Sequence, residues 1–149
     1  MTATAHAIIG TVIAAKIGNP ALAIPIAIAS HVAADIFPHW DSGTNGSSKS
    51  KKRLFFEASF DVVLGFIISY TIMQTLFPQT NLLYAFVIIL ASQSLDWITA
   101  PYYIFGMKSQ PFLWFYKFQK KYNTKMDKPW GIIYQVAALI VVVAAGVLL

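Results

Sequence analysis

The chain alternates between long apolar stretches and short polar ones, and five apolar stretches can be distinguished. They cover residues 4–17, 21–37, 54–77, 82–99 and 130–149. Pro101 is expected to end or kink the fourth stretch, and Pro129 occupies a favoured first position of a helix before the fifth. Each stretch can cross or nearly cross a bilayer as a helix. The pattern predicts an all-α polytopic membrane protein, a bundle of about five transmembrane helices in a single domain, residues 1–149.

The composition favours a membrane protein over an ordinary soluble domain. Hydrophobic residues make up 57% of the chain, charged residues only 11%, and the mean hydropathy is +0.61. A typical soluble domain carries roughly 25% charged residues. The chain has no cysteine. Neither disulfides nor thiolate ligands are therefore available, and any bound metal ion must be held by nitrogen and oxygen.

Residues 102–128, between the fourth and fifth stretches, combine aromatic rings with lysines. The lysines are Lys108, Lys117, Lys120, Lys121, Lys125 and Lys128. Such a segment is expected to lie in the membrane interface, with its rings at headgroup level and its lysines towards anionic lipid. Because apolar stretches flank it, we expect membrane lipids as its partners and no nucleic acid. A second polar segment, residues 41–53, is rich in Ser, Gly and Asn and predicts a flexible loop.

The uneven distribution of basic residues predicts an orientation in the membrane. If five helices cross in alternation, the N-terminus, the 38–53 loop and the 100–128 segment share one side, which carries ten of the eleven basic residues. Only Lys16 lies on the other side. The positive-inside rule places the lysine-rich side in the cytoplasm. The N-terminus is therefore expected in the cytoplasm and the C-terminus outside.

Five of the six carboxylates and all three histidines lie in or beside apolar stretches, towards the end that this topology places in the cytoplasm. They are His6, His31, His39, Asp35, Asp41, Glu57, Asp61 and Asp96. An ionisable side chain at membrane depth costs about 2.5 kcal/mol or more on insertion scales, so it is retained mainly where it faces a partner, a cavity or an ion. The convergence of eight such groups predicts a metal site, and a hydrolytic one.

The spacing around the second apolar stretch concentrates this chemistry. His31 and Asp35 are four residues apart and lie on one helix face. Pro38 then turns the chain, so His39 and Asp41 can fold back towards the same point. Imidazole and carboxylate together suit zinc, and also iron or manganese.

We predict one or two divalent ions, with zinc as the first candidate. The predicted ligands are His6, His31, Asp35, His39 and Asp61. Glu57 or Asp96 is predicted to act as the general base, which takes a proton from water whose pKa the ion has lowered. Two-ion sites are common in the hydrolysis of phosphate esters, because the ions stabilise both the attacking and the leaving oxygen.

Several of these residues also allow simpler roles. His31 and Asp35 could form a buried hydrogen-bonded pair that stabilises helix packing. Glu57 could pair with Arg53, four residues before it, in a surface ion pair of little energetic weight. Asp96 could hydrogen-bond within its own helix. In these roles the carboxylates would serve the fold and not a reaction.

Three motifs resemble those of the predicted membrane-bound metal-dependent hydrolases, a group of small bacterial and archaeal inner-membrane proteins. The motifs are Thr4-Ala5-His6-Ala7-Ile8-Ile9-Gly10, Ser30-His31-x-x-x-Asp35-x-x-Pro38-His39, and Ser94-Leu95-Asp96-Trp97-Ile98-Thr99 followed by Pro111-Phe112-Leu113-Trp114. The resemblance covers most of the first 115 residues in patches. The second motif also resembles the metal clusters of zinc-dependent phospholipases C. The chain departs from the family at Ser92, where the later family cluster would carry a histidine.

The resemblance implies metal-assisted hydrolysis, in a prokaryotic inner membrane. We therefore expect a hydrolase that acts on a lipid or other interfacial ester at the cytoplasmic face, with a phosphoester as the leading candidate. The alternative is a non-enzymatic membrane protein in which the same cluster holds an ion for structure or handles ions. The halves of the helices away from the cluster offer few polar residues, which argues against an ion path through a monomer.

Overall fold

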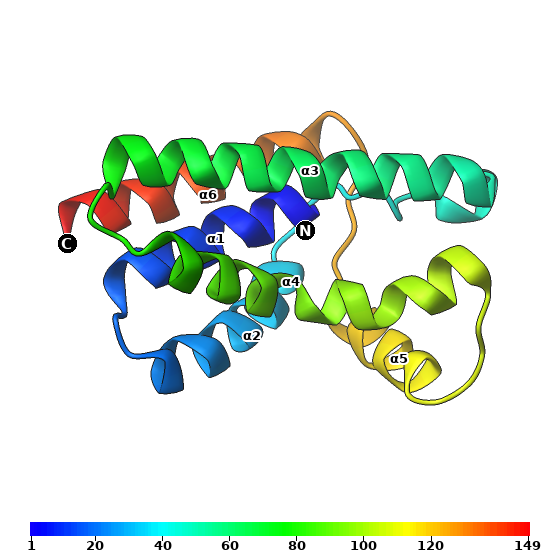
Figure 1. Ribbon diagram of the computed structural model, residues 1–149. Coiled ribbons are helices and arrows are strands. Elements are labelled where there is room, and N and C mark those ends of the chain that lie inside the picture. The colour runs from blue at the N-terminus through cyan, green and yellow to red at the C-terminus, as the bar shows by residue number, and fades with distance from the viewer.

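The computed structural model describes residues 1–149 and contains helices but no β-strands (Figure 1). The prediction of an all-α fold is therefore confirmed. The six α-helices are α1 (Ala3–Lys16), α2 (Pro20–Ile36), α3 (Lys51–Leu76), α4 (Leu82–Phe105), α5 (Phe112–Tyr122) and α6 (Trp130–Leu148). A short 3-10 helix, η1 (Gly46–Ser48), lies in the loop before α3.

Four helices, α1, α2, α3 and α6, closely follow the predicted apolar stretches, but α4 is longer than predicted. The helix is expected to end near Thr99, yet it continues through Pro101 to Phe105. Proline removes one N–H donor from a helix, and neighbouring helices can compensate for that loss inside a bundle. The helix ends instead at Gly106, which adopts a φ of 72° and whose N–H donates to the carbonyl of Tyr102 at 3.0 Å.

Three helices, α3, α4 and α6, are long and apolar enough to cross a membrane. This number is smaller than the five predicted, because α1 and α2 are apolar but have only 14 and 17 residues. Large apolar side chains are exposed on the three long helices, among them Phe60 at 69%, Leu83 at 73% and Val141 at 67%. Such surfaces suit hydrocarbon better than water. The helices are therefore consistent with insertion into a membrane.

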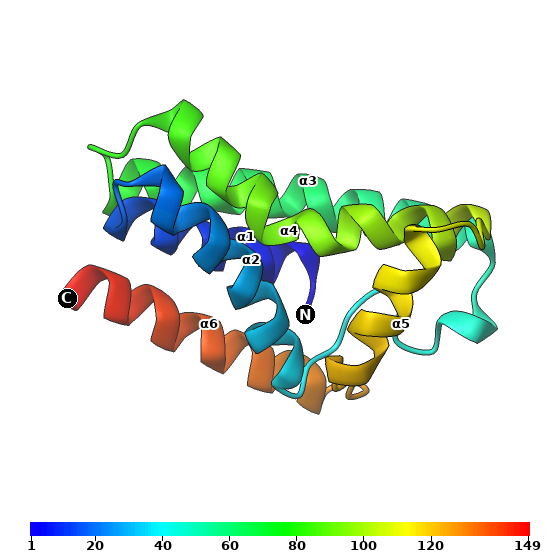
Figure 2. The same ribbon diagram turned by 90° about the horizontal axis from the view of Figure 1, so that it is seen from below.

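Helix α1 lies among α2, α3, α4 and α6 in both views of the molecule (Figures 1 and 2). Small residues allow its neighbours to approach closely. A Cβ atom added at Gly10 would lie 2.6 Å from Ser92 Oγ and 3.1 Å from Ile89 Cα of α4. A Cβ atom at Gly65 of α3 would lie 3.0 Å from the Cα atom of Thr4. Glycine at these crossings lets the backbones pack closely, as in many membrane helix pairs.

The longer polar connections lie towards one end of the bundle, and the short turns lie at the other. The loop after α2 and the helix α5 lie at the right in Figure 1, and the α1–α2 and α3–α4 turns lie at the left with the C-terminus. Backbone hydrogen bonds join the loop after α2 to the segment before α6. The N–H of Met126 donates to the carbonyl of His39 at 2.7 Å, and the N–H of Thr124 donates to that of Asp35 at 2.8 Å. These bonds hold the end of α2 and the loop after it against the segment that precedes α6.

Candidate metal centre

Three imidazole rings surround the carboxylate of Asp35. The Nε2 atom of His6 lies 3.3 Å from Asp35 Oδ1, that of His31 lies 3.5 Å from Oδ2, and that of His39 lies 3.8 Å from Oδ1. All four side chains are buried. His6 comes from α1, His31 and Asp35 from the last turns of α2, and His39 from the segment after it. The ammonium group of Met1 also contacts Asp35 Oδ1.

Backbone carbonyls fix the protonation of two of these rings. Nδ1 of His31 lies 2.7 Å from the carbonyl oxygen of Ser92, and Nδ1 of His39 lies 2.7 Å from that of Phe37. A carbonyl can only accept, so each Nδ1 must carry the proton and donate. In the neutral form of each ring the lone pair is then on Nε2, the nitrogen nearer to Asp35. Histidine ligands of metal ions are held in this way, by a hydrogen bond from the nitrogen that does not bind the ion.

Two of the buried ring nitrogens have no hydrogen-bond partner. They are Nε2 of His6 and Nε2 of His39. Buried polar atoms are nearly always paired, so an unpaired atom calls for an explanation such as a bound ion. Two unpaired nitrogens beside one carboxylate fit a cation between them.

The separations between the ligand atoms match those around a zinc ion. With ligand distances of about 2.0 to 2.1 Å, the edges of a tetrahedron are about 3.3 to 3.4 Å. The observed separations are 3.3 Å from His6 Nε2 to Asp35 Oδ1, 3.5 Å from His31 Nε2 to the other oxygen of Asp35, Oδ2, and 3.5 Å from His31 Nε2 to Asp96 Oδ1. His6, His31 and Asp96 each offer a ligand atom, and these atoms lie within 4.8 Å of one another. These three residues are therefore a group that could hold a metal ion.

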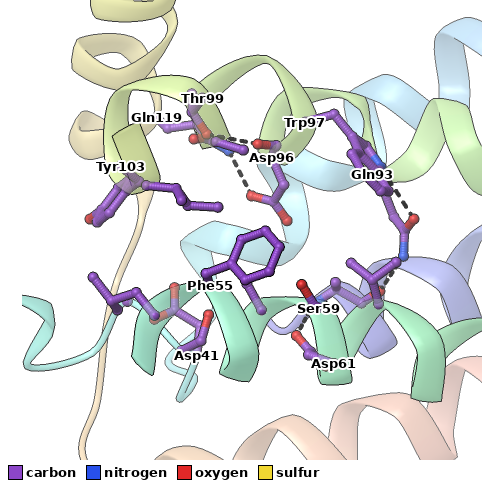
Figure 3. Close-up of a pocket in the computed structure, with 18 of the residues that line it drawn as sticks. Asp41, Phe55, Ser59, Asp61, Gln93, Asp96, Trp97, Thr99, Tyr103 and Gln119 are labelled. Carbon is purple, nitrogen blue, oxygen red and sulfur yellow. Dashed lines mark hydrogen bonds between the residues drawn. The ribbon is translucent and has the colours of Figure 1, made fainter. Parts of the chain in front are cut away.

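Asp96 lies 3.5 Å from His31 Nε2 and also lines a cavity between α3, α4 and α5. Figure 3 shows its side chain in this cavity. Its side chain is 40% exposed, whereas that of Asp35 is 4% exposed. The amide of Gln119, from α5, donates to Asp96 Oδ1 at 3.2 Å and lies 3.0 Å from His31 Nε2. Asp96 is thus the carboxylate of the cluster that a bound molecule could reach.

Ser92 supports the cluster through its backbone and its hydroxyl group. The Ser92 carbonyl accepts from His31, and its Oγ donates to the carbonyl of His6 at 2.8 Å. The rings of His6 and His31 stack with centroids 3.7 Å apart. At the position where the resembling family would carry a histidine, this chain therefore has a residue that hydrogen-bonds to the ring of His31 and to the backbone of His6.

Asp61, a predicted ligand, is not brought to the histidines. Its carboxylate accepts from the N–H of Ala3 at 2.6 Å, and from the N–H and the hydroxyl of Thr4 at 3.1 and 2.7 Å. These are the donors at the start of α1, which a helix leaves without partners. Asp61 therefore caps α1 from the side of α3 and holds the helix that carries His6.

Glu57, a predicted general base, also lies away from the cluster. Its carboxylate pairs with Lys49 at 2.8 Å and with Arg53 at 2.7 Å. The simpler role considered for Glu57, the pair with Arg53, is the one that the structure shows. Of the two candidates for the base, the structure brings only Asp96 to the histidines.

Asp41 lies at the far side of His39, where it is held by a lysine. Lys125 Nζ donates to Asp41 Oδ1 at 3.0 Å, Thr44 Oγ1 donates to the same oxygen at 3.0 Å, and His39 Nε2 is 3.8 Å from Oδ2. Burial favours the neutral carboxyl group, but the contact with His39 and the charge of Lys125 outweigh it and hold the pKa of Asp41 below its usual range. Asp41 is therefore a charged carboxylate that already has a cation beside it.

Several residues near the cluster could not be identified from the sequence pattern. Gln119 belongs to a segment whose pattern indicates only an interfacial location, and Asn123, whose amide lies 3.4 Å from Asp35 Oδ2, belongs to the same segment. Ser92 and Gln93 could have been suspected, because they are polar residues inside an apolar helix. Gln93 donates to the carbonyl of Ala3 at 2.9 Å and so also holds the start of α1.

The fold and the cluster define an all-helical protein with membrane-length helices and a buried centre of imidazole and carboxylate groups. No protein-family model, curated protein or solved structure matches the chain. The resemblance to membrane-bound metal-dependent hydrolases therefore stays a prediction that rests on the sequence motifs.

Proposed function

We propose that the protein is a membrane-embedded, metal-dependent hydrolase, and that His6, His31 and Asp35 hold a zinc ion. One observation carries the proposal. The Nε2 atoms of three histidines converge on one buried carboxylate, and two of the rings are oriented by hydrogen bonds from Nδ1 to backbone carbonyls. Catalytic zinc sites use three protein ligands and keep one position for water or substrate.

The residues around the proposed ion have separate tasks. Zinc supplies a Lewis acid that lowers the pKa of water and stabilises negative charge on a phosphoryl or carbonyl oxygen. Asp96 borders both the ligand atoms and the cavity, so its carboxylate can accept the proton from the attacking water. Gln119 donates to Asp96 and can direct it. His39 Nε2 lies 3.8 Å from Asp35 Oδ1 and makes no hydrogen bond, so it is adjacent to the proposed ion.

A lipid or other interfacial phosphoester is the proposed substrate class. The cavity beside Asp96 is bounded by residues of α3 and α4, the helices with membrane length, and by lysines of α5 and the segment after it. Such a site suits a molecule with an apolar part and an anionic head. The placement in a prokaryotic inner membrane follows from the family resemblance.

All five long or medium helices, α1, α2, α3, α4 and α6, are proposed to cross the membrane, with the N-terminus in the cytoplasm. Because α1 is surrounded by other helices, it can be shorter than a helix that faces lipid along its whole length. The lysine-rich end with α5 is then cytoplasmic. The metal centre lies at the inner ends of α1 and α2, near that surface.

Cysteine labelling tests this orientation directly, since the chain has no native cysteine. Ser47→Cys, in the exposed loop before α3, is expected to react with a membrane-impermeant maleimide only after the membrane is opened. Gln79→Cys, in the exposed turn between α3 and α4, should react in intact cells and serves as the matched control. Labelling of Ser47→Cys from the outside would reverse the topology and remove the cytoplasmic placement of the centre.

One observation favours a second candidate function, a structural metal site. His39 Nε2 is buried and unpaired, so it could complete a closed set of four protein ligands with His6, His31 and Asp35. Closed tetrahedral sites stabilise a fold and leave no position for substrate. The two functions therefore differ in whether the ion has an open position.

Replacement of the native ion by cobalt(II) distinguishes the two functions. If the site is catalytic, addition of azide is expected to change the visible absorption of the cobalt protein, because azide occupies the open position. The native protein should in parallel cleave at least one member of a panel of lipid and soluble phosphoesters. His39→Ala serves as the control, because it opens a position only in the closed structural site and leaves the open position of the catalytic site as it is. An azide-insensitive native spectrum, together with no cleavage, would establish the structural site.

A further inference from the structure

We propose that the cavity between α3, α4 and α5 binds one anionic phospholipid, with its phosphate at Lys120 and Lys125 and an acyl chain against α3 and α4. This inference rests on the proposed function only in assigning the lipid as substrate. The binding itself depends on the cavity, its charges and its opening towards the membrane.

The cavity has the size and the position of a ligand site. Its volume is about 820 Å³, within the range of small-molecule sites. Asp96, Gln119 and Asn123 all line it, and each of them also contacts His31 or Asp35. In Figure 3, Asp96 and Gln119 lie on one side of the cavity and Asp61 on the other, with Phe55 between them. A bound molecule would therefore place its head next to the metal centre.

One wall of the cavity is apolar and exposed on the outside of the bundle. Phe55 and Val63 of α3 are 44% and 56% exposed, and Trp97 and Phe105 of α4 are 47% and 70% exposed. If α3 and α4 cross the membrane as proposed, these side chains face hydrocarbon. The wall is thus continuous with the lipid-facing surface, and an acyl chain can enter sideways between α3 and α4 without crossing water.

Two lysines, Lys120 and Lys125, also line the cavity. Lys120 lines the cavity and has no carboxylate partner, whereas Lys125 shares Asp41. The three carboxylates that line the cavity are already engaged: Asp41 by Lys125, Asp61 by the start of α1, and Asp96 by Gln119. Of these partners only Lys125 carries a charge, so Lys120 is the lining cation without an ion pair, and a phosphate oxygen is the group that it would bind.

A soluble phosphate and a lipid phosphate share this headgroup chemistry, but the apolar wall favours the lipid. Burial of an acyl chain contributes about 0.8 kcal/mol for each CH₂ group, which a soluble ester cannot gain. The cavity is accordingly expected to discriminate by chain as well as by charge. Four molecules separate the contribution of the acyl chain from that of the charge: phosphatidic acid, neutral phosphatidylcholine, uncharged diacylglycerol and glycerol phosphate.

The test is native mass spectrometry of the full-length, metal-loaded protein released from detergent, titrated with these four molecules. One phosphatidic acid is expected to bind per chain, more tightly than the other three. Lys120→Gln should weaken the binding of phosphatidic acid by about tenfold or more, as loss of a charged hydrogen bond does. The binding of diacylglycerol should not change. Lys121 is the neighbouring lysine that does not line the cavity, so Lys121→Gln should leave the binding of both lipids unchanged.

A second pair of variants tests the cavity itself. Ser59→Trp fills the space from α3 and should abolish stoichiometric lipid binding, whereas Phe60→Trp, which points away from the cavity at 69% exposure, should not. If Ser59→Trp does not fold, the Lys120 and Lys121 pair still decides. Equal binding of phosphatidylcholine, or no effect of Lys120→Gln, would show unspecific annular lipid and overturn the proposal. Binding of glycerol phosphate as tight as that of phosphatidic acid would overturn the proposal in favour of a soluble ester.

The outcomes separate this inference from the proposed function. Specific lipid binding without any cleavage would keep the cavity assignment and remove the hydrolase. If the Ser59→Trp protein still cleaves the phosphoester as the native protein does, the hydrolase is kept and the cavity assignment is removed.

Discussion

Replacement of His31 by alanine is expected to remove most of the divalent ion from the purified protein. His31 Nε2 lies 3.5 Å from both Asp35 and Asp96, and its other nitrogen is fixed by the Ser92 carbonyl. Loss of a residue that only supports a ligand costs about 10- to 100-fold in metal affinity, so loss of the ligand should cost more than about 100-fold. The measurement is elemental analysis of protein purified without chelator, expressed as ions per chain.

Asp35→Asn should have the same effect, because the carboxylate is the anionic centre that all three histidines contact. Glu57→Gln serves as the matched control. It also removes a carboxylate, but one that is engaged by Lys49 and Arg53 away from the cluster, so the ion should be retained. Circular dichroism and size-exclusion chromatography establish that each variant is folded. A native protein without stoichiometric metal would refute the ligand assignment.

The second large effect is expected from Asp96→Asn, which should retain the metal and the fold but lose activity. The amide keeps the size of the side chain and can still bind an ion weakly or accept from Gln119, but it cannot take a proton at neutral pH. Positioned general bases contribute about 10²- to 10⁴-fold, so kcat should fall by that factor. The assay uses whichever phosphoester the native protein cleaves in a broad screen.

The matched control for this loss is again Glu57→Gln, since Glu57 does not line the cavity or contact a histidine. Full activity is expected from it. Full activity of Asp96→Asn would show that the proton goes elsewhere. Loss of metal from Asp96→Asn would instead make Asp96 a ligand, consistent with the 4.8 Å grouping of His6, His31 and Asp96.

The proposed roles of α5 follow from its double contact. Its lysines and aromatic rings suit a membrane surface, and its Gln119 reaches into the centre. None of the helices α1, α2, α3, α4 and α6 supplies the amide that contacts both His31 and Asp96. Helix α5 therefore contributes to the histidine and carboxylate cluster, which the sequence pattern does not indicate.

Much of the fold was predictable because its determinants are local. The apolar lengths and the positions of proline and glycine place α1, α2, α3 and α6 within a few residues. The exception at Pro101 is also instructive. Proline weakens a helix by a fixed amount, but whether the helix ends there depends on its neighbours, and these lie far away in the sequence.

By itself, the sequence determined the helical class, the membrane-like composition and the core of the site. His31, Asp35 and His39 are close along the chain, and the spacing of four residues on one helix brings His31 and Asp35 together. The tertiary structure alone decided which distant groups join them. Asp61 and Asp96 lie at similar depth in apolar helices, yet Asp61 caps α1 and Asp96 meets His31. The physical reason is that depth depends on position along a helix, whereas contact depends on its rotation and neighbours, which packing sets.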